Sequence, residues 1–137
     1  MTTVVLDTNI VVSALLNPLG QPGRVLKMVM DGEADLILTR DIEMEYRDVL
    51  SRPKFNFTPS LVKGVISYLC KKAHYLTPIP QKADFSRDPD DEVFYNLAIS
   101  AGAILITGNI KDYPTNTSVV TAREFLQNYA KGADSAT

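Results

Sequence analysis

The sequence predicts an α/β fold in which helices cover both faces of a parallel sheet. Short apolar runs rich in β-branched residues alternate with longer segments whose apolar residues recur at helical spacing. The runs are almost continuously apolar, as is typical of strands buried on both faces. Because no repeat, low-complexity segment or linker interrupts this pattern, we expect residues 1–130 to form one domain, followed by a disordered tail at 131–137.

Five short segments are predicted to be strands. The first stops abruptly at Asp7, and the fourth stops in the same way at a polar turn that begins with Thr107. Strands that end so sharply in polar residues place those residues at the edge of the sheet. The predicted strands are Val4–Leu6, Leu36–Leu38, Tyr75–Leu76, Ile104–Ile106 and Ser118–Val120.

Six segments with helical spacing are predicted to be helices, and proline or glycine follows most of them closely. In the fourth, we expect the buried face to consist of Leu61, Val65, Tyr68 and Leu69. The predicted helices are Thr8–Leu16, Arg24–Met30, Asp41–Ser51, Ser60–Ala73, Asp90–Ala101 and Ala122–Ala130.

The composition is that of an ordinary soluble protein, with 45% hydrophobic and 22% charged residues. No apolar run approaches the roughly 20 residues of a membrane helix, and the N-terminus lacks the basic region of a signal peptide. The single cysteine, Cys70, is expected to be a small buried hydrophobe. These features favour a cytoplasmic protein. Because the net charge is −2, a nucleic-acid-binding function would need divalent cations to supply part of the positive charge.

Asp7 is the first candidate for chemistry. It directly follows a predicted strand, and ligands of open α/β sheets bind in the crevice at the carboxyl ends of the strands. An Asp at this position is also well suited to cap the helix that follows. From Asp7 alone, the functional and the capping interpretations both stay open.

Two glutamates in the predicted helix 41–51 are further candidates. Glu43 and Glu45 flank its apolar stripe on opposite sides, and helical periodicity does not choose between them. The residues of that stripe are Ile42, Tyr46, Val49 and Leu50.

Asp91 is the next candidate, at the start of the predicted helix 90–101. Asp88 and Pro89 suit the N-cap and the first helical position. Asp91 precedes Phe94 and Ala98 by three and seven residues, so it projects toward the apolar side of the helix. A carboxylate in that direction must be paired, hydrogen-bonded or bound to a metal ion. Favourable interaction with the helix dipole is the alternative interpretation.

Acids that converge from separate elements would repel one another unless a cation held them together. Oxygen ligands favour Mg²⁺ or Mn²⁺, and one histidine with one cysteine nearly excludes a zinc site. Acid clusters that bind Mg²⁺ act mainly on phosphoryl groups. A phosphodiester hydrolase is therefore the favoured chemistry, and no glycine-rich phosphate loop is present, since Gly20–Gly23 lacks the required lysine and spacing.

The order of four motifs carries a resemblance to a known family. They are Leu6-Asp7-Thr8-Asn9, then Glu45 inside Ile42–Tyr46, then Asp91 seven residues before Ala98, and finally Ile106-Thr107-Gly108-Asn109. With these motifs the chain resembles the PIN-domain family of ribonucleases from Val4 to about Tyr129. The segment Glu45–Phe55 is similar to a subgroup that forms the toxin components of toxin–antitoxin systems.

The resemblance implies a three-layer α/β/α fold with a parallel sheet of about five strands. It also implies Mg²⁺- or Mn²⁺-dependent cleavage of single-stranded RNA that leaves 5′-phosphate and 3′-hydroxyl ends. In the second motif it favours Glu45 over Glu43. Asn9 would form hydrogen bonds within the site, and Thr107 would position a ligand or a water molecule. The implied metal-binding residues are Asp7, Glu45 and Asp91.

One position departs from the family pattern. Many members carry a fourth acid where this chain has Asn109, whose amide oxygen can bind Mg²⁺ but brings no charge. Three carboxylates would give a firm site for one cation and leave a second site open. Asp112, three residues further on, could supply the missing charge if the loop folds back.

Basic and aromatic side chains are candidates for substrate binding, although solvated surface positions are the alternative for each cation. Tyr46, Phe55 and Phe57 could stack on bases, although core packing is the favoured interpretation of Tyr46. The toxin resemblance implies a small antitoxin whose basic side chain would enter the acid cluster, and a possible homodimer. The candidate cations are Arg24, Arg40, Arg52, Lys54 and Lys111.

Two other functions fit parts of the pattern. A receiver-type signalling domain also gathers acids around Mg²⁺, but it needs a phosphate-accepting Asp after the third strand, and Leu76–Pro78 contains none. A noncatalytic module that binds RNA or protein could keep the fold without the fourth acid. Such a module would show no metal-dependent turnover.

Overall fold

The structure, a computed structural model, describes residues 2–79, 89–115 and 118–130. Within them, the predicted α/β class and parallel sheet are confirmed, because five strands pair in the order β3-β2-β1-β4-β5 and every pair is parallel. The expected cap at Asp88 and the tail at 131–137 lie outside the described residues. The strands are β1 (Thr3–Leu6), β2 (Asp35–Leu38), β3 (His74–Tyr75), β4 (Ile104–Ile106) and β5 (Val119–Val120).

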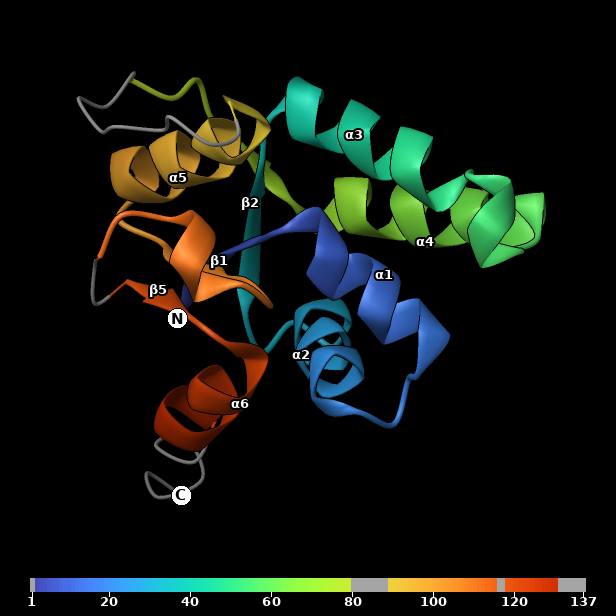
Figure 1. Ribbon diagram of the computed structural model, residues 1–137, viewed down its shortest axis with the longest axis horizontal. Helices are drawn as coiled ribbons and strands as arrows, with labels where there is room; N and C mark the ends of the chain where they lie inside the picture. Colours follow the sequence, from blue (N-terminus) through green and yellow to red (C-terminus); the bar gives the residue numbers. More distant parts are fainter. Residues whose placement is uncertain (1, 80–88, 116–117, 131–137) are drawn as a thin grey trace.

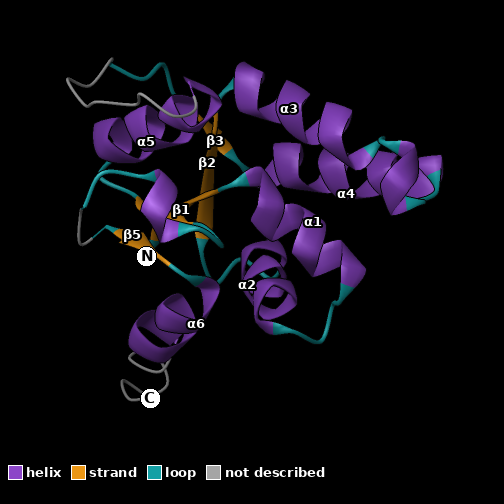
Figure 2. Ribbon diagram, viewed as in Figure 1, coloured by secondary structure: helices purple, strands orange, loops and turns teal. Residues whose placement is uncertain are grey.

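Helices cover both faces of this sheet, as the three-layer prediction requires. In Figure 1, α1, α2 and α4 lie on one side of β2 and α5 lies on the other, and α5 packs against β1, β2 and β4. Figure 2 distinguishes the helices and strands of the described residues from the loops that join them. The α-helices are α1 (Thr8–Leu16), α2 (Gln21–Met30), α3 (Arg40–Leu50), α4 (Pro59–Lys72), α5 (Pro89–Ala101) and α6 (Ala122–Phe125).

Three short helical segments of other types complete the described chain. A 3₁₀ turn spans Pro53–Phe55, and a second spans Ile110–Asp112 after β4. The last predicted helix is not a single α-helix, because its second half, Leu126–Ala130, is a π-helix. Within the described residues, no helix is long and apolar enough to cross a membrane.

The register of the two central strands places their polar ends side by side. Leu6 pairs with Ile106, so that Asp7 and Thr107 are the next residues on neighbouring strands. The main-chain N–H of Asp7 donates to the carbonyl of Ile106 at 3.0 Å and extends the ladder by one step. β1, at the centre of the sheet, is fully buried from Val4 to Leu6. Asp7 is thus the first polar residue that follows the most buried strand.

The predicted buried face of α4 was partly wrong. Leu61 and Tyr68 are 43% and 42% exposed, and the buried stripe turns instead toward Val62 and Ile66. Tyr68 stays at the rim of the stripe because its hydroxyl donates to the main-chain carbonyl of Met30 at 2.9 Å. The stripe of α3 is confirmed at Ile42, Tyr46 and Leu50, whereas Val49 is half-buried. Cys70 is also half-buried rather than enclosed, and desolvation raises the pKa of its thiol.

Candidate active site

Asp7 is held by hydrogen bonds from three parts of the chain, and its side chain is 7% exposed. Its Oδ1 accepts the main-chain N–H of Asn9 at 3.3 Å, which makes Asp7 the N-cap of α1. Its Oδ2 accepts the hydroxyl of Thr107 at 2.9 Å and the hydroxyl of Tyr113 at 3.0 Å. The capping interpretation of Asp7 is therefore correct, and it does not compete with a role in chemistry, because the cap uses a different oxygen from the two hydroxyl groups.

The two glutamates of α3 point to different places. Glu45 accepts a hydrogen bond from the hydroxyl of Thr8, the residue that follows Asp7. Glu43 instead accepts the hydroxyl of Tyr75 at 2.6 Å, and this hydrogen bond is the main cause of its lowered pKa. Of the two, Glu45 is the one that reaches the end of β1, a choice that helical periodicity left open.

Asp91 lies in the first turn of α5 and is half-buried. The negative charges of Asp7 and Asp91 both act on the hydroxyl of Tyr113. Burial first, and then these charges, raise the pKa of Tyr113 far above its usual value. Tyr113 therefore stays protonated and donates to Asp7 at neutral pH.

A second buried tyrosine, Tyr46, joins α3 to the end of β1. Burial first, and then the charges of Asp7 and Glu45, raise the pKa of Tyr46 well above its usual value. Its hydroxyl donates to the carbonyl of Leu6 at 2.5 Å, so α3 is fixed against the last residue of β1. Tyr46 and Thr8 thus hold α3, which carries Glu45, against the end of β1.

The donor set around Asp7 suits a hard dication, because it consists of carboxylate and hydroxyl oxygens without sulfur or imidazole. Among the described residues, Oδ1 of Asp7 accepts just the 3.3 Å hydrogen bond from the main-chain N–H of Asn9. It therefore keeps an acceptor position for a ligand. In the arrangement shown by the described residues, no three His, Cys, Asp or Glu side chains are close enough together to hold an ion. Binding would therefore draw the carboxylates of Glu45 and Asp91 toward that of Asp7.

The turn after β4 folds back on itself. Thr107, which is fully buried, accepts the main-chain N–H of Asn109 at 3.1 Å while it donates to Asp7. The side-chain amide of Asn109 donates to Asp112 at 2.9 Å, so the carboxylate of Asp112 lies next to Asn109. Asn9 is exposed, and its main-chain N–H contacts Asp7.

The five candidate cations do not share one surface. Arg40 is the first residue of α3, whereas Arg52 lies beyond its last residue, Leu50, and the helix between them is about 16 Å long. Arg52 pairs with Asp48 at 3.2 Å. The ammonium group of Lys54 lies over the ring of Phe55, 5.0 Å from its centroid, in the 3₁₀ turn Pro53–Phe55 that follows α3. Arg24 on α2 and Lys111 in the turn after β4 are both exposed.

Phe55 and Phe57 stack on one another at 5.8 Å with an interplanar angle of 16°. Both are half-buried and pack against the core. Both follow the C-terminal end of α3, whereas Glu45 lies in the middle of that helix.

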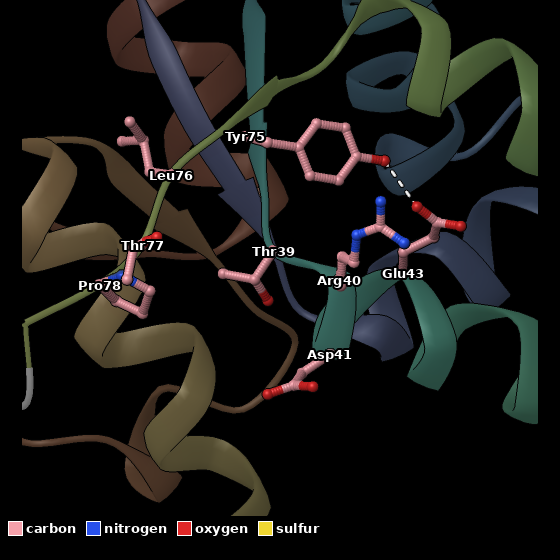
Figure 3. Close-up of a pocket in the computed structure, with 8 residues that line it drawn as sticks. All are labelled: Thr39, Arg40, Asp41, Glu43, Tyr75, Leu76, Thr77 and Pro78. Carbon is pink, nitrogen blue, oxygen red and sulfur yellow. Dashed lines mark hydrogen bonds between the residues drawn. The ribbon is translucent and has the colours of Figure 1, made fainter.

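A pocket of about 760 Å³ opens at the carboxyl ends of β2 and β3. Figure 3 shows Arg40 and Glu43 on one wall, with the hydroxyl of Tyr75 reaching Glu43. Because β2 pairs with β1, this pocket opens at the same edge of the sheet as Asp7. Its lining residues are Thr39, Arg40, Asp41, Glu43, Tyr75, Leu76, Thr77 and Pro78.

Residues 3–111 match the family model of the PIN domain. The chain belongs to the PIN domain family. PIN domains are generally nucleases and generally use divalent metals such as Mg²⁺, so the family assignment makes this chain a nuclease-type hydrolase. All four resemblance motifs, from Leu6 to Asn109, lie within the matched span.

One relative extends the match beyond the family model. The chain is 28% identical to the uncharacterized protein MJ1680 of Methanocaldococcus jannaschii, over 93% of this chain and 92% of the relative. No solved structure matches the chain at a significant level. The PIN assignment therefore rests on the family model, and the fold is described from this chain itself.

Proposed function

We propose that this PIN domain is a Mg²⁺- or Mn²⁺-dependent endoribonuclease that hydrolyses phosphodiester bonds in single-stranded RNA. One observation carries the proposal: the buried Asp7 sits at the end of the central strand, where Thr107 and Tyr113 hold its Oδ2 and Thr8 donates a hydrogen bond to Glu45. Acids brought together at this edge of an α/β sheet would repel one another, and a cation bound between them would offset that repulsion.

In this proposal Asp7, Glu45 and Asp91 bind the cation. When bound, the cation supplies a hydroxide for in-line attack on the phosphorus and neutralises the leaving oxygen. Thr107 orients Asp7 through its 2.9 Å hydrogen bond, and the exposed Asn9, in the first turn of α1, forms a hydrogen bond within the site. The resulting products carry 5′-phosphate and 3′-hydroxyl ends.

Asn109 and Asp112 bear on the number of cations. Asn109 stands where many family members carry a fourth acid, and its side-chain amide donates a hydrogen bond to Asp112. We propose one firm cation site formed by the three carboxylates, and a weaker second site to which Asp112 contributes when substrate phosphate is present.

Removal of the metal is the direct test of the activity. A 5′-labelled single-stranded RNA should be cut in the presence of Mg²⁺ or Mn²⁺, left intact with EDTA, and cut again when the metal is restored. The new ends should be 5′-phosphate and 3′-hydroxyl, as tested with phosphatase and ligase. Equal cleavage with EDTA, or binding of RNA without any metal-dependent turnover, would support the noncatalytic module instead.

Arg40 is proposed to bind a phosphate of the RNA next to the scissile bond. It is the one candidate cation that lines the pocket at the ends of β2 and β3. Arg40 is exposed, and the ion pairs of α3 among the described residues are made by Arg47 and Arg52 instead. Asp41 and Glu43 share that wall and limit the attraction, so the effect of one arginine is modest.

Arg40→Ala should raise KM for RNA about threefold with kcat unchanged. The slope of log affinity against log salt should become shallower by about 0.7, the value for one phosphate contact with a single strand. Arg52→Ala, at the other end of α3, is the matched control and should change neither quantity. An unchanged salt slope for Arg40→Ala would remove this pocket from the RNA path.

The toxin role is the finer part of the proposal and rests on the similarity of Glu45–Phe55 to toxin components. A cognate antitoxin would insert an arginine or lysine side chain into the cluster of Asp7, Glu45 and Asp91. The complex would be inactive, and the free protein, alone or as a homodimer in the cytoplasm, would cleave RNA. Co-expression with the product of the neighbouring gene, followed by purification and a cleavage assay, tests this role.

A further inference from the structure

The hydroxyl of Tyr113 makes a contact that neither its position in the chain nor its burial requires. Tyr113 follows the 3₁₀ turn Ile110–Asp112 and is 6% exposed. A phenylalanine would bury the same ring without the cost of desolvating a hydroxyl. Instead, the hydroxyl donates to Oδ2 of Asp7, across a separation of 106 residues in the sequence.

Two hydroxyl donors converge on the same oxygen of Asp7. Thr107 donates from the end of β4 at 2.9 Å, and Tyr113 donates from beyond the 3₁₀ turn at 3.0 Å. The two lone pairs of Oδ2 are thereby used. Within the described part of the chain, Oδ1 accepts the 3.3 Å cap hydrogen bond from Asn9 alone, so it is the oxygen with an acceptor position left.

The surroundings make the Tyr113 contact strong. The hydroxyl of Thr107 also accepts the main-chain N–H of Asn109, which fixes the direction of its own proton toward Asp7. Tyr113 reaches Asp7 from a different element, and both side chains are buried, so water does not compete. Hydrogen bonds of this kind to a carboxylate are roughly twice as strong as neutral ones.

Nearby negative charge keeps the hydroxyl of Tyr113 in its donating form. The charges of Asp7, Asp91 and Asp112 all act on this hydroxyl and disfavour its ionisation.

We propose that Tyr113 is a positioning residue for the metal-binding carboxylate of Asp7: together with Thr107 it holds Oδ2, and so directs Oδ1 toward the cation. This inference rests on the proposed metal-dependent function. Removal of a residue that hydrogen-bonds to a metal ligand typically weakens metal affinity by roughly 10- to 100-fold. The contribution of Tyr113 should therefore appear in cation affinity before it appears in the maximal rate.

The test compares four proteins: wild type, Tyr113→Phe, Tyr68→Phe and Asp7→Asn. Tyr68→Phe is the matched control, because it removes a hydroxyl of similar geometry, 2.9 Å from the carbonyl of Met30, on an exposed surface. The dissociation constant for Mn²⁺ is measured without RNA by electron paramagnetic resonance of the free ion. The Mn²⁺ dependence of RNA cleavage and the melting temperature are measured beside it.

Tyr113→Phe should weaken Mn²⁺ binding about tenfold or more. Saturating Mn²⁺ should restore the maximal cleavage rate to within about twofold of wild type, because the reacting groups themselves are intact. Tyr68→Phe should match wild type in both respects. Incorporation of 4-aminophenylalanine at position 113, which returns an N–H donor to the ring, should recover most of the lost affinity and provides the test if the phenylalanine variant does not fold.

A Mn²⁺ affinity of Tyr113→Phe equal to that of wild type would overturn the inference, even if the melting temperature fell. Failure of the amino derivative to recover affinity would overturn it as well. If Asp7→Asn bound Mn²⁺ as wild type does, or if wild type bound none, the proposed function itself would fail. Loss of binding in Asp7→Asn with normal binding in Tyr113→Phe would reject only the role of Tyr113.

Discussion

Asp7→Asn should reduce metal-dependent RNA cleavage by at least about 100-fold, the upper end of what even an outer-shell residue contributes. The substitution removes the charge of the carboxylate that lies at the centre of the proposed site. It keeps an oxygen that can cap α1, since Asn and Asp are similarly good N-caps. The loss should therefore concern the cation and not the fold.

Asp48→Asn is the matched control for this prediction. It makes the same chemical change on α3, where Asp48 pairs with Arg52 at an exposed site, and it should leave cleavage unchanged. Initial rates with Mg²⁺ titrated to saturation, together with circular dichroism, provide the comparison. Retained Mg²⁺ binding and unchanged cleavage in a folded Asp7→Asn protein would reject Asp7 as a metal-binding residue.

Gly23→Ala should destabilise the protein by about 3 kcal/mol, at the upper end of typical overpacking costs. Gly23 is buried in the first turn of α2. A Cβ at this position would lie 2.1 Å from the carbonyl oxygen and 2.5 Å from the carbonyl carbon of Pro18. Because these are main-chain atoms, they cannot swing aside, and α2 would have to move from the turn that joins it to α1.

Gly64→Ala is the opposite case and serves as the control. Gly64 lies inside α4, and a Cβ there would meet no atom within 4 Å. Alanine should therefore raise the stability by roughly 0.5–1 kcal/mol through its better helix propensity. Urea unfolding of both variants measures the difference. If Gly23→Ala were as stable as wild type, α2 would not be packed on the main chain of Pro18.

The strands and their polar ends were predictable because they depend on local sequence. A buried run that stops at Asp7 or Thr107 signals the sheet edge without knowledge of its neighbours, and the register of β1 and β4 places these two residues side by side. The buried face of α4 was less predictable. Leu61 and Tyr68 lie at the rim of its stripe, where exposure depends on what packs beside the helix.

The site could be predicted only in part. Periodicity could not choose between Glu43 and Glu45, because the choice is made by Thr8 and Tyr75 from other elements. The sequence did not assign Tyr113 to the site, and it named Tyr46 only as an aromatic side chain that could stack on bases.

Both tyrosines form their hydrogen bonds over long separations, 40 residues for Tyr46 and 106 for Tyr113. The only local signal was that a buried tyrosine needs a partner for its hydroxyl. That rule predicts a partner without naming it.

A crystal structure of the protein soaked in Mn²⁺ tests the central claim most directly. We predict an anomalous peak at the end of β1, about 2.1 Å from Oδ1 of Asp7, with the carboxylates of Glu45 and Asp91 drawn in around it. Tyr113 and Thr107 should still contact Oδ2. An Asp7 with no ion at saturating Mn²⁺, or a Glu45 and Asp91 turned away from the ion, would contradict the account.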